Sequence, residues 1–116
     1  MEPMKPKKRA RPEDKIRDRL KKFLELRGWF VVIMHGSMYQ SGIPDLYATH
    51  KDYGPRWIEV KLPHMEGSKF TVAQVAKFPK LSENGSPIWI LTGSSEQEYR
   101  KLFEPENWFT YMMLKL

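Results

Sequence analysis

Two carboxylates and one amine are placed in this sequence so that folding could bring them to a single point. Asp45 ends the turn-like segment 42–45, Gly-Ile-Pro-Asp, and Glu59 and Lys61 lie in the segment that follows it. Residues 56–62 alternate in character with period two, which predicts a strand whose successive side chains point to opposite faces. The acid and the amine of that strand therefore project from one face.

These residue types suit the hydrolysis of a phosphodiester. The reaction requires neutralisation of the phosphate oxygens, an activated water and stabilisation of the departing oxyanion. Magnesium prefers oxygen ligands and is commonly held by one or two carboxylates. Asp45 and Glu59 could be that pair, with the carbonyl of Val60 as a further ligand. Lys61 could then place a positive charge beside the attacking water or the phosphate.

Two further polar residues share a helix face with apolar residues. Glu13 lies on the apolar stripe of a predicted helix over 12–27, and Gln74 on that of a second predicted helix over 71–81. Both side chains could therefore point at the sheet. Thr71 and Gln74 also have the spacing of a capping box, so a purely structural role for Gln74 stays open.

The remaining patterns predict an order of helices and strands around these residues. After the first helix, three strands over 29–34, 45–49 and 56–62 form a meander. The second helix leads to the uncharged run 88–91, which predicts a central strand buried on both faces. A final helix is predicted over 96–103, and 108–112 is either an edge strand or a partner contact.

Tryptophan and histidine residues are assigned mainly structural positions. Trp29 and Trp89 fall in the most apolar strands, which predicts core positions for both. Trp57 alternates onto the face of Glu59, where it could pack under the first helix or lie against a substrate. The three histidines show no metal-ligand spacing, and we assign them no catalytic role.

The composition excludes several classes of protein. The 116 residues suffice for one hydrophobic core with a tail, and the absence of cysteine excludes disulfide frameworks, zinc ribbons and thiol nucleophiles. No apolar run approaches the roughly 20 residues of a membrane helix, and no apolar segment follows the basic N-terminus. We expect a soluble, intracellular protein without membrane contact, in the cytoplasm of a bacterial or virus-infected cell or in a nucleus.

The net charge of +6 is concentrated at the N-terminus. Residues 1–11 are predicted to form a basic flexible tail that precedes a domain over 12–116. A Lys/Arg/Pro segment cannot build a core, and it would bind phosphates through counterion release. A nuclear targeting signal and a solvated leader are the other interpretations of this tail.

The order of the motifs resembles that of the PD-(D/E)xK nuclease superfamily, and most closely its VRR-NUC (virus-type replication-repair nuclease) branch. The motifs are Glu13, then 42–45, then Ile58-Glu59-Val60-Lys61, then Thr71-Val72-Ala73-Gln74, and the resemblance spans about residues 12–92. It implies a restriction-endonuclease-like α/β core, in which α-helices flank a mixed β-sheet. It also implies phosphodiester hydrolysis that depends on Mg²⁺ or Mn²⁺ and uses no organic cofactor.

The resemblance also assigns roles to individual residues. It gives catalytic roles to Glu13, Asp45, Glu59, Lys61 and Gln74, and metal ligation to Asp45, Glu59, Val60 and Glu13. The family is similar to Holliday junction resolvases, and its compact stand-alone members resemble dimeric, structure-selective nucleases. The sequence departs from the family at 35–40, His-Gly-Ser-Met-Tyr-Gln, where relatives often have an Asn-Ser-Gly-like stretch.

We therefore expect a metal-dependent DNA endonuclease that selects branched, flapped or junction DNA in replication, repair or recombination. A homodimer is expected from the apolar run 108–114 and from the resemblance. Nucleic-acid contacts are expected from Lys7, Lys8, Arg9, Arg11, Ser37, Tyr39, Gln40 and Lys69.

Two alternatives remain open at this point. The chain could be a non-catalytic DNA-binding module or a sequence-specific, restriction-like nuclease. Taken singly, Glu59 and Lys61 could be an ion pair on a solvated sheet face, and Asp45 could simply end a turn.

Overall fold

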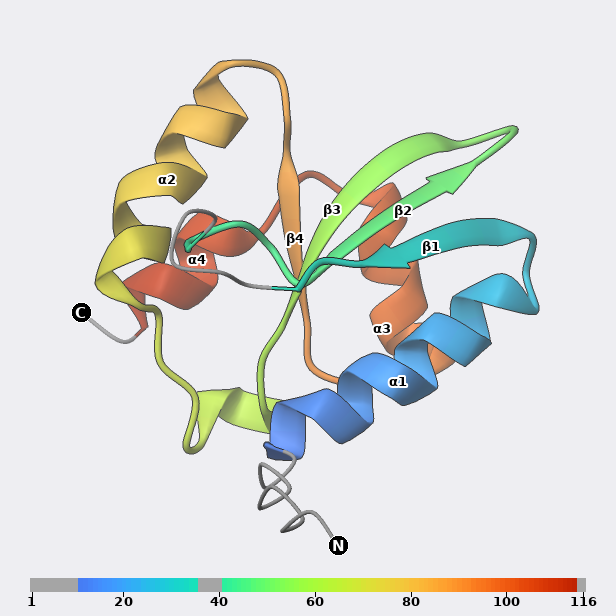
Figure 1. The fold of residues 1–116 in the computed structure, drawn as a ribbon, viewed down its shortest axis with the longest axis horizontal. Helices are drawn as coiled ribbons and strands as arrows, with labels where there is room; N and C mark the ends of the chain where they lie inside the picture. The colour runs from blue at the N-terminus through green and yellow to red at the C-terminus, as the bar shows by residue number, and fades with distance from the viewer. Residues whose placement is uncertain (1–10, 36–40, 115–116) are drawn as a thin grey trace, which may run out of the picture.

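The fold is a mixed sheet with helices on both of its faces (Figure 1), as seen in a computed structural model that describes residues 11–35 and 41–114. The elements in chain order are α1 (Pro12–Glu25), β1 (Trp29–Ile33), β2 (Leu46–His50), β3 (Gly54–Val60), the short 3₁₀ turn η1 (Pro63–Met65), α2 (Val72–Glu83), β4 (Ile88–Leu91), α3 (Glu96–Arg100), the 3₁₀ turn η2 (Lys101–Phe103) and α4 (Trp108–Met113). The predicted α/β class is confirmed.

The sheet has four strands in the order β1-β2-β3-β4. The first three form the predicted antiparallel meander. β4 pairs with β3 in parallel, and α2 forms the crossover that a parallel pair requires. The sheet is therefore mixed, as the resemblance implied.

Two apolar clusters sandwich the sheet. α1 and η2 contribute Leu20, Leu24 and Leu102 to the first, which also includes Ile58 and Val60 of β3. α2, β4 and α4 build the second from Phe78, Ile88, Ile90 and Met112. Strand β3 thus turns alternate side chains toward different surroundings, as its period-two pattern predicted.

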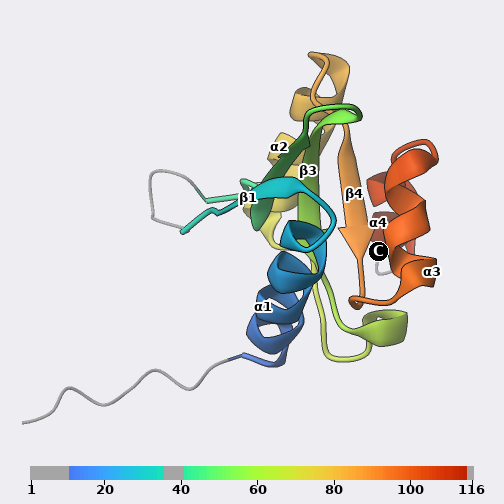
Figure 2. The ribbon, with the colours of Figure 1, turned by 90° about the vertical axis from the view of Figure 1, so that its right-hand side faces the viewer.

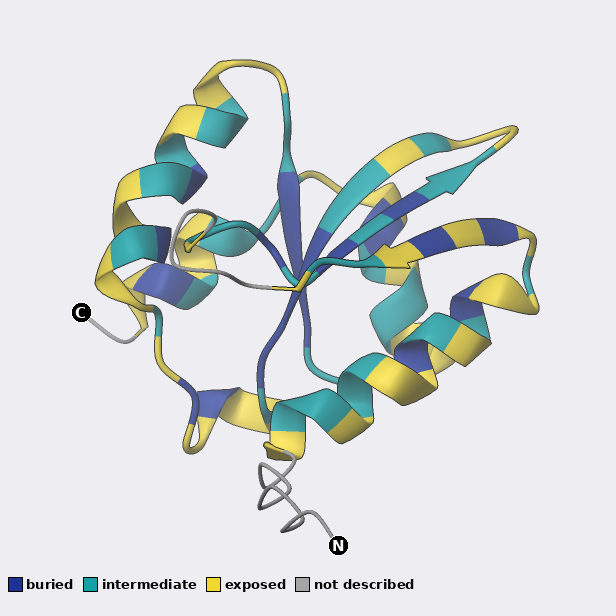
Figure 3. Ribbon diagram, viewed as in Figure 1, coloured by how far each residue is buried: buried dark blue, intermediate teal, exposed yellow. Residues whose placement is uncertain are grey.

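The prediction that 88–91 is a central strand is wrong, because β4 is the last strand of the sheet. All four of its residues are nevertheless buried, as the dark blue of β4 in Figure 3 shows. Side chains take the place of a fifth strand. The Asn107 amide bonds both the N–H and the carbonyl of Ile90, and the Glu106 carboxylate accepts from the N–H of Ile88. This edge is closed by side-chain hydrogen bonds, which satisfies its backbone groups.

Residues 108–112 form a helix, and the alternative of an edge strand is wrong. α4 lies next to β4, together with α3 (Figure 2). Trp108, Tyr111 and Met112 pack toward the second cluster at positions i, i+3 and i+4, which is helical spacing. The aromatic and Thr residues of this run favour a strand by propensity, and tertiary packing overrides that preference.

The tryptophans lie mostly where the sequence predicts them. Trp29 and Trp89 are buried in the first cluster. Trp57 packs against the second cluster and beside Tyr47, so of its two predicted alternatives the position under the first helix is wrong. No helix of the described residues is long and apolar enough to cross a membrane.

Candidate active site

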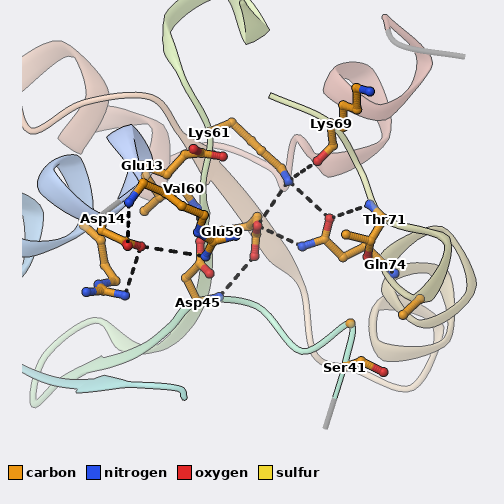
Figure 4. A pocket seen from close by; sticks show the side chains of 14 residues that line it. Glu13, Asp14, Ser41, Asp45, Glu59, Val60, Lys61, Lys69, Thr71 and Gln74 are labelled. Atoms are coloured by element: carbon orange, nitrogen blue, oxygen red, sulfur yellow. Dashed lines mark hydrogen bonds and ion pairs between the residues drawn. The ribbon is translucent and has the colours of Figure 1, made fainter. Parts of the chain in front are cut away.

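The register of the sheet brings the first carboxylate to the second. β2 and β3 pair with Leu46 opposite Ile58, so Asp45, one residue before β2, comes opposite Glu59. The Asp45 backbone N–H donates to Glu59 Oε1 at 3.1 Å, and Asp45 Oδ2 accepts from the Val60 N–H at 2.9 Å. These two reciprocal bonds hold the end of the 42–45 turn against β3 (Figure 4).

Gly42 positions this turn on the second helix. Its φ of +86° favours glycine, because other residues rarely adopt this conformation. A Cβ atom at this position would lie 2.6 Å from the carbonyl oxygen of Ala73 in α2. The Lys77 ammonium also donates to the carbonyl of Ser41. The turn that carries Asp45 therefore packs directly on the backbone of α2.

Lys61 donates to a complete set of acceptors inside the protein. Its Nζ lies 2.6 Å from the carbonyl oxygen of Lys69, 3.2 Å from Gln74 Oε1 and 3.3 Å from Glu59 Oε2. An ammonium has three N–H donors, so three oxygen partners match its charged form. The Phe70 ring lies 4.6 Å from the same nitrogen, a distance suited to a cation–π contact.

Gln74 makes the helix-capping bond that its spacing with Thr71 predicts, and it also contacts the charged pair. Its Oε1 accepts from the backbone N–H of Thr71, which completes a capping box at the start of α2. Its Nε2 donates to Glu59 Oε2 at 2.9 Å. The amide has one possible orientation here, because Thr71 and Lys61 present donors and Glu59 presents an acceptor. Gln74 therefore joins the helix cap to the charged pair.

The charged pair lies inside the protein, and its interpretation as an ion pair on a solvated sheet face is wrong. Glu59 and Lys61 each have a relative exposure of 3%. Burial, and then repulsion from Asp45, raises the pKa of Glu59 to about 8. Burial also raises the pKa of Asp45. Two neighbouring carboxyl groups are thus held where ionisation is costly unless a cation joins them.

These groups line a pocket of about 330 Å³ between α1 and α2. Glu13 and Asp14 approach from the α1 side and Gln74 and Thr71 from the α2 side, with Asp45, Glu59 and Lys61 between them (Figure 4). The structure therefore brings all five residues with predicted catalytic roles to one pocket. Arg11, Arg17 and Lys69 also line it.

The donor set of this pocket suits a hard divalent cation. Asp45 and Glu59 supply carboxylate oxygens, the ligand type that Mg²⁺ and Mn²⁺ prefer. Within the described residues, no group of three His, Cys, Asp or Glu side chains is close enough to form a ligand set by itself. Two carboxylates with water and phosphate oxygens are the usual arrangement for Mg²⁺, so this set fits.

The predicted nucleic-acid contacts lie partly within reach of the pocket. Arg11 was assigned to the tail, and the structure places it directly before α1, where its N–H donates to the Asp14 carboxylate. Lys69 lies on the other side of the pocket. Lys7, Lys8, Arg9, Ser37, Tyr39 and Gln40 lie outside the described residues.

Two residues near the site were not predicted from the sequence. Arg17 lies one helical turn after Glu13, so the same periodicity could have identified it. Its guanidinium pairs with Asp14 at 3.3 Å. Ser68 is 2% exposed and bonds Glu13 from a loop without periodicity, so no sequence pattern could have identified it.

The fold is similar to that of a solved structure described as a VRR_NUC domain. The match has a TM-score of 0.64 and 20% sequence identity, and it covers 82% of this chain and 98% of that one. No family model matches the sequence, and no curated protein matches it. At this level of identity the match confirms the fold that the motif order implied.

Proposed function

We propose that this chain is a nuclease of the VRR-NUC type, a metal-dependent DNA endonuclease. The observation that carries the proposal is the constellation of Asp45 with the buried pair Glu59 and Lys61 in the pocket between α1 and α2. The same residues stand in the motif order of the family, and the chain has the fold of a VRR_NUC domain. Burial raises the pKa of both carboxyl groups, and a shared cation would stabilise their ionised forms.

Asp45 and Glu59 would hold Mg²⁺ or Mn²⁺, with the Val60 carbonyl and Glu13 as candidates for further ligands. The bound ion would neutralise the phosphate oxygens, lower the pKa of a water molecule and stabilise the leaving oxyanion. The reciprocal bonds between the 42–45 turn and β3 fix the spacing of the two carboxylates before any ligand arrives. This preorganisation reduces the rearrangement needed when substrate binds.

Lys61 serves as a positive charge that approaches the scissile phosphate or the attacking water. In the described structure its three donors contact Lys69, Gln74 and Glu59. One of these bonds would be exchanged for a phosphate oxygen or the water when substrate enters. Gln74 remains attached to the α2 cap, so it limits how far the Lys61 ammonium can move.

DNA would enter from the mouth of the pocket, where cationic side chains gather. Arg11, Arg17 and Lys69 line the opening around the acidic centre, an arrangement that attracts the backbone and holds a phosphate near the carboxylates. Backbone contacts of this kind do not read sequence, which is compatible with a nuclease that selects branched, flapped or junction DNA by its structure.

Cleavage of labelled linear, flapped and four-way-junction DNA tests the proposal. Wild-type protein should cut in Mg²⁺ or Mn²⁺ and not in chelator, and Lys61→Ala, Asp45→Asn and Glu59→Gln should bind DNA without cutting it. Lys101→Ala is the matched control, because Lys101 is another lysine paired with a glutamate, Glu98, away from the pocket. Its activity should equal that of the wild type.

The outcomes separate the alternatives. Metal-dependent cutting that persists in Lys61→Ala would contradict the assigned site. DNA binding without cutting by the wild type would favour the non-catalytic binding module. Cutting of linear DNA at one defined sequence would favour the restriction-like alternative.

A further inference from the structure

Ser68 is a buried polar residue that the mechanism above does not use. It lies in the loop between η1 and α2, with an exposure of 2%. Its hydroxyl oxygen accepts from the backbone N–H of Leu62, two residues after β3, at 2.7 Å. Because that oxygen already accepts this bond, its own proton is free to point elsewhere.

The hydroxyl of Ser68 donates to Oε2 of Glu13 at 3.4 Å. Glu13 lies in the first turn of α1, and Ser68 therefore joins the start of that helix to the segment directly after Glu59 and Lys61. The bond ties Glu13, which lies on the α1 side of the pocket (Figure 4), to the segment that follows β3.

The loop that presents Ser68 has an unusual backbone. His64 and Met65 have φ values of 56° and 61°, in the left-handed region that residues other than glycine avoid. The Met65 side chain is 1% exposed, and its burial offsets part of the cost of this conformation. Backbone strain that a fold maintains is typical of segments that position functional groups.

The residues after Ser68 contact the same site. The carbonyl of Lys69 accepts from the Lys61 ammonium, and the Phe70 ring lies beside it. Consecutive residues of one loop thus contact both Glu13 and Lys61. A loop of this kind fixes the relative position of two site residues that come from different elements.

We propose that Ser68 is a positioning residue, which sets the place of the Glu13 carboxylate relative to the metal ligands Asp45 and Glu59. This inference rests on the proposed function, because it assigns Glu13 a part in binding the cation through a bound water, since Glu13 does not complete a three-carboxylate ligand set with Asp45 and Glu59. Groups that hydrogen-bond to a metal-binding side chain typically change metal affinity by about 10- to 100-fold when they are removed. Ser68→Ala should therefore weaken Mn²⁺ binding by about tenfold.

A double-mutant cycle on Mn²⁺ affinity, measured by calorimetry with purified protein, tests the proposal. The variants are Ser68→Ala, Glu13→Ala and the double variant. If Ser68 acts through Glu13, the double variant should bind Mn²⁺ as Glu13→Ala does, and the two single effects should not multiply. Ser82→Ala is the matched control, because Ser82 also donates to a glutamate, Glu106, away from the pocket. Its Mn²⁺ affinity should not change.

Ser68→Ala also leaves the N–H of Leu62 without its acceptor, so its stability is measured in parallel by urea unfolding. The double variant is compared with Glu13→Ala alone. If Ser68→Ala causes a general loss of packing, the double variant will bind Mn²⁺ more weakly than Glu13→Ala does. Such a fall would overturn the proposal, as would unchanged Mn²⁺ binding by either single variant.

Cleavage by the same variants separates this proposal from the proposed function. If the wild type binds Mn²⁺ and the cycle shows the expected coupling without DNA cleavage, Ser68 has its positioning role and the nuclease assignment fails. If the wild type cleaves DNA while Ser68→Ala retains full Mn²⁺ affinity, the nuclease assignment stands and the role of Ser68 is overturned.

Discussion

Glu59 is buried and has several hydrogen-bonding and charged partners. Together these determine whether its carboxyl group is protonated. Its two oxygens accept from the Asp45 backbone and from the Gln74 amide, and the Lys61 ammonium lies next to it. Burial, and then repulsion from Asp45, still raises the pKa of Glu59 to about 8. At neutral pH the metal-free site therefore retains a proton that a cation would displace.

The raised pKa makes the stability of the metal-free protein depend on pH. The reference pKa of a glutamate is 4.5, so between 4.5 and about 8 the folded protein binds protons that the unfolded chain lacks. The free energy of unfolding should therefore fall as pH rises through this window. We expect the melting temperature in chelator to be lower at pH 8 than at pH 5.

Glu59→Gln is the control for this prediction. The variant has no titrating group at this position, so its melting temperature should fall less between pH 5 and pH 8 and should exceed that of the wild type at pH 8. Differential scanning fluorimetry measures both proteins in the same buffers. An equal pH dependence in the two proteins would contradict the assignment.

The same linkage predicts the pH dependence of metal binding. Mn²⁺ requires ionised carboxylates, so its binding must release the proton held by Glu59. The rise in melting temperature on addition of Mn²⁺ should be larger at pH 8 than at pH 6. Asp45→Asn, which removes one ligand, should show little rise at either pH, and a full rise in that variant would exclude Asp45 as a ligand.

Variants of Gln74 and Thr71 distinguish the helix-capping role of Gln74 from its contacts in the site. Thr71→Ala removes one capping bond, which should cost about 1 kcal/mol of stability and leave cleavage largely intact. Gln74→Ala removes the other capping bond together with the contacts to Glu59 and Lys61. Its cleavage should fall on the order of tenfold to a hundredfold. Urea unfolding and single-turnover cleavage of both variants check this, and equal losses of cleavage would assign Gln74 to the cap alone.

At the scale of elements, the site depends on the contact between the 42–45 turn and α2. Gly42→Ala would force a Cβ atom onto the carbonyl of Ala73 at a backbone conformation that favours glycine. The turn would have to move, and Asp45 with it. We expect a lower melting temperature and a large loss of cleavage.

Gly85→Ala provides the matched control for Gly42→Ala. Gly85 has a similar φ of +90°, but no atom lies within 4 Å of the position of an added Cβ. The variant should lose about 1–2 kcal/mol through the backbone alone and retain its activity. Full cleavage by Gly42→Ala would show that the packing of the turn on α2 does not determine the position of Asp45.

Secondary structure was predictable where periodicity was strong. α1 and the three strands of the meander were expected from their apolar spacing and differ from the structure by a few residues at their ends. α4 was not predicted, because its short aromatic run has strand-like propensity and becomes a helix by packing on β4. The edge position of β4 was also missed, because burial on both faces usually indicates a central strand.

At the scale of the whole molecule, α4 exposes apolar side chains that a second copy could cover. Its inner residues pack on the sheet, whereas Phe109, Met113 and Leu114 are more than half exposed. We propose that this surface contributes to a homodimer. Light scattering at tens of micromolar should give twice the mass of the chain, and Phe109→Glu with Met113→Lys should give the monomer mass. A monomeric wild type would exclude the dimer.

The sequence by itself determined which residues could carry the chemistry and in what order. Residue type and the alternation of 56–62 identified Asp45, Glu59 and Lys61, and the family resemblance carried by the motif order implied the mixed α/β fold. These features are local, because period and residue type are read within a short window.

The tertiary structure alone decided the environment of those residues. Alternation places Glu59 and Lys61 on one face but does not state what covers that face, and α2 with its preceding loop buries them both. The joint role of Gln74, the bond from Ser68 to Glu13 and the raised carboxyl pKa values follow from contacts between segments distant in sequence. Burial and electrostatics are sums over such contacts, so no local pattern contains them.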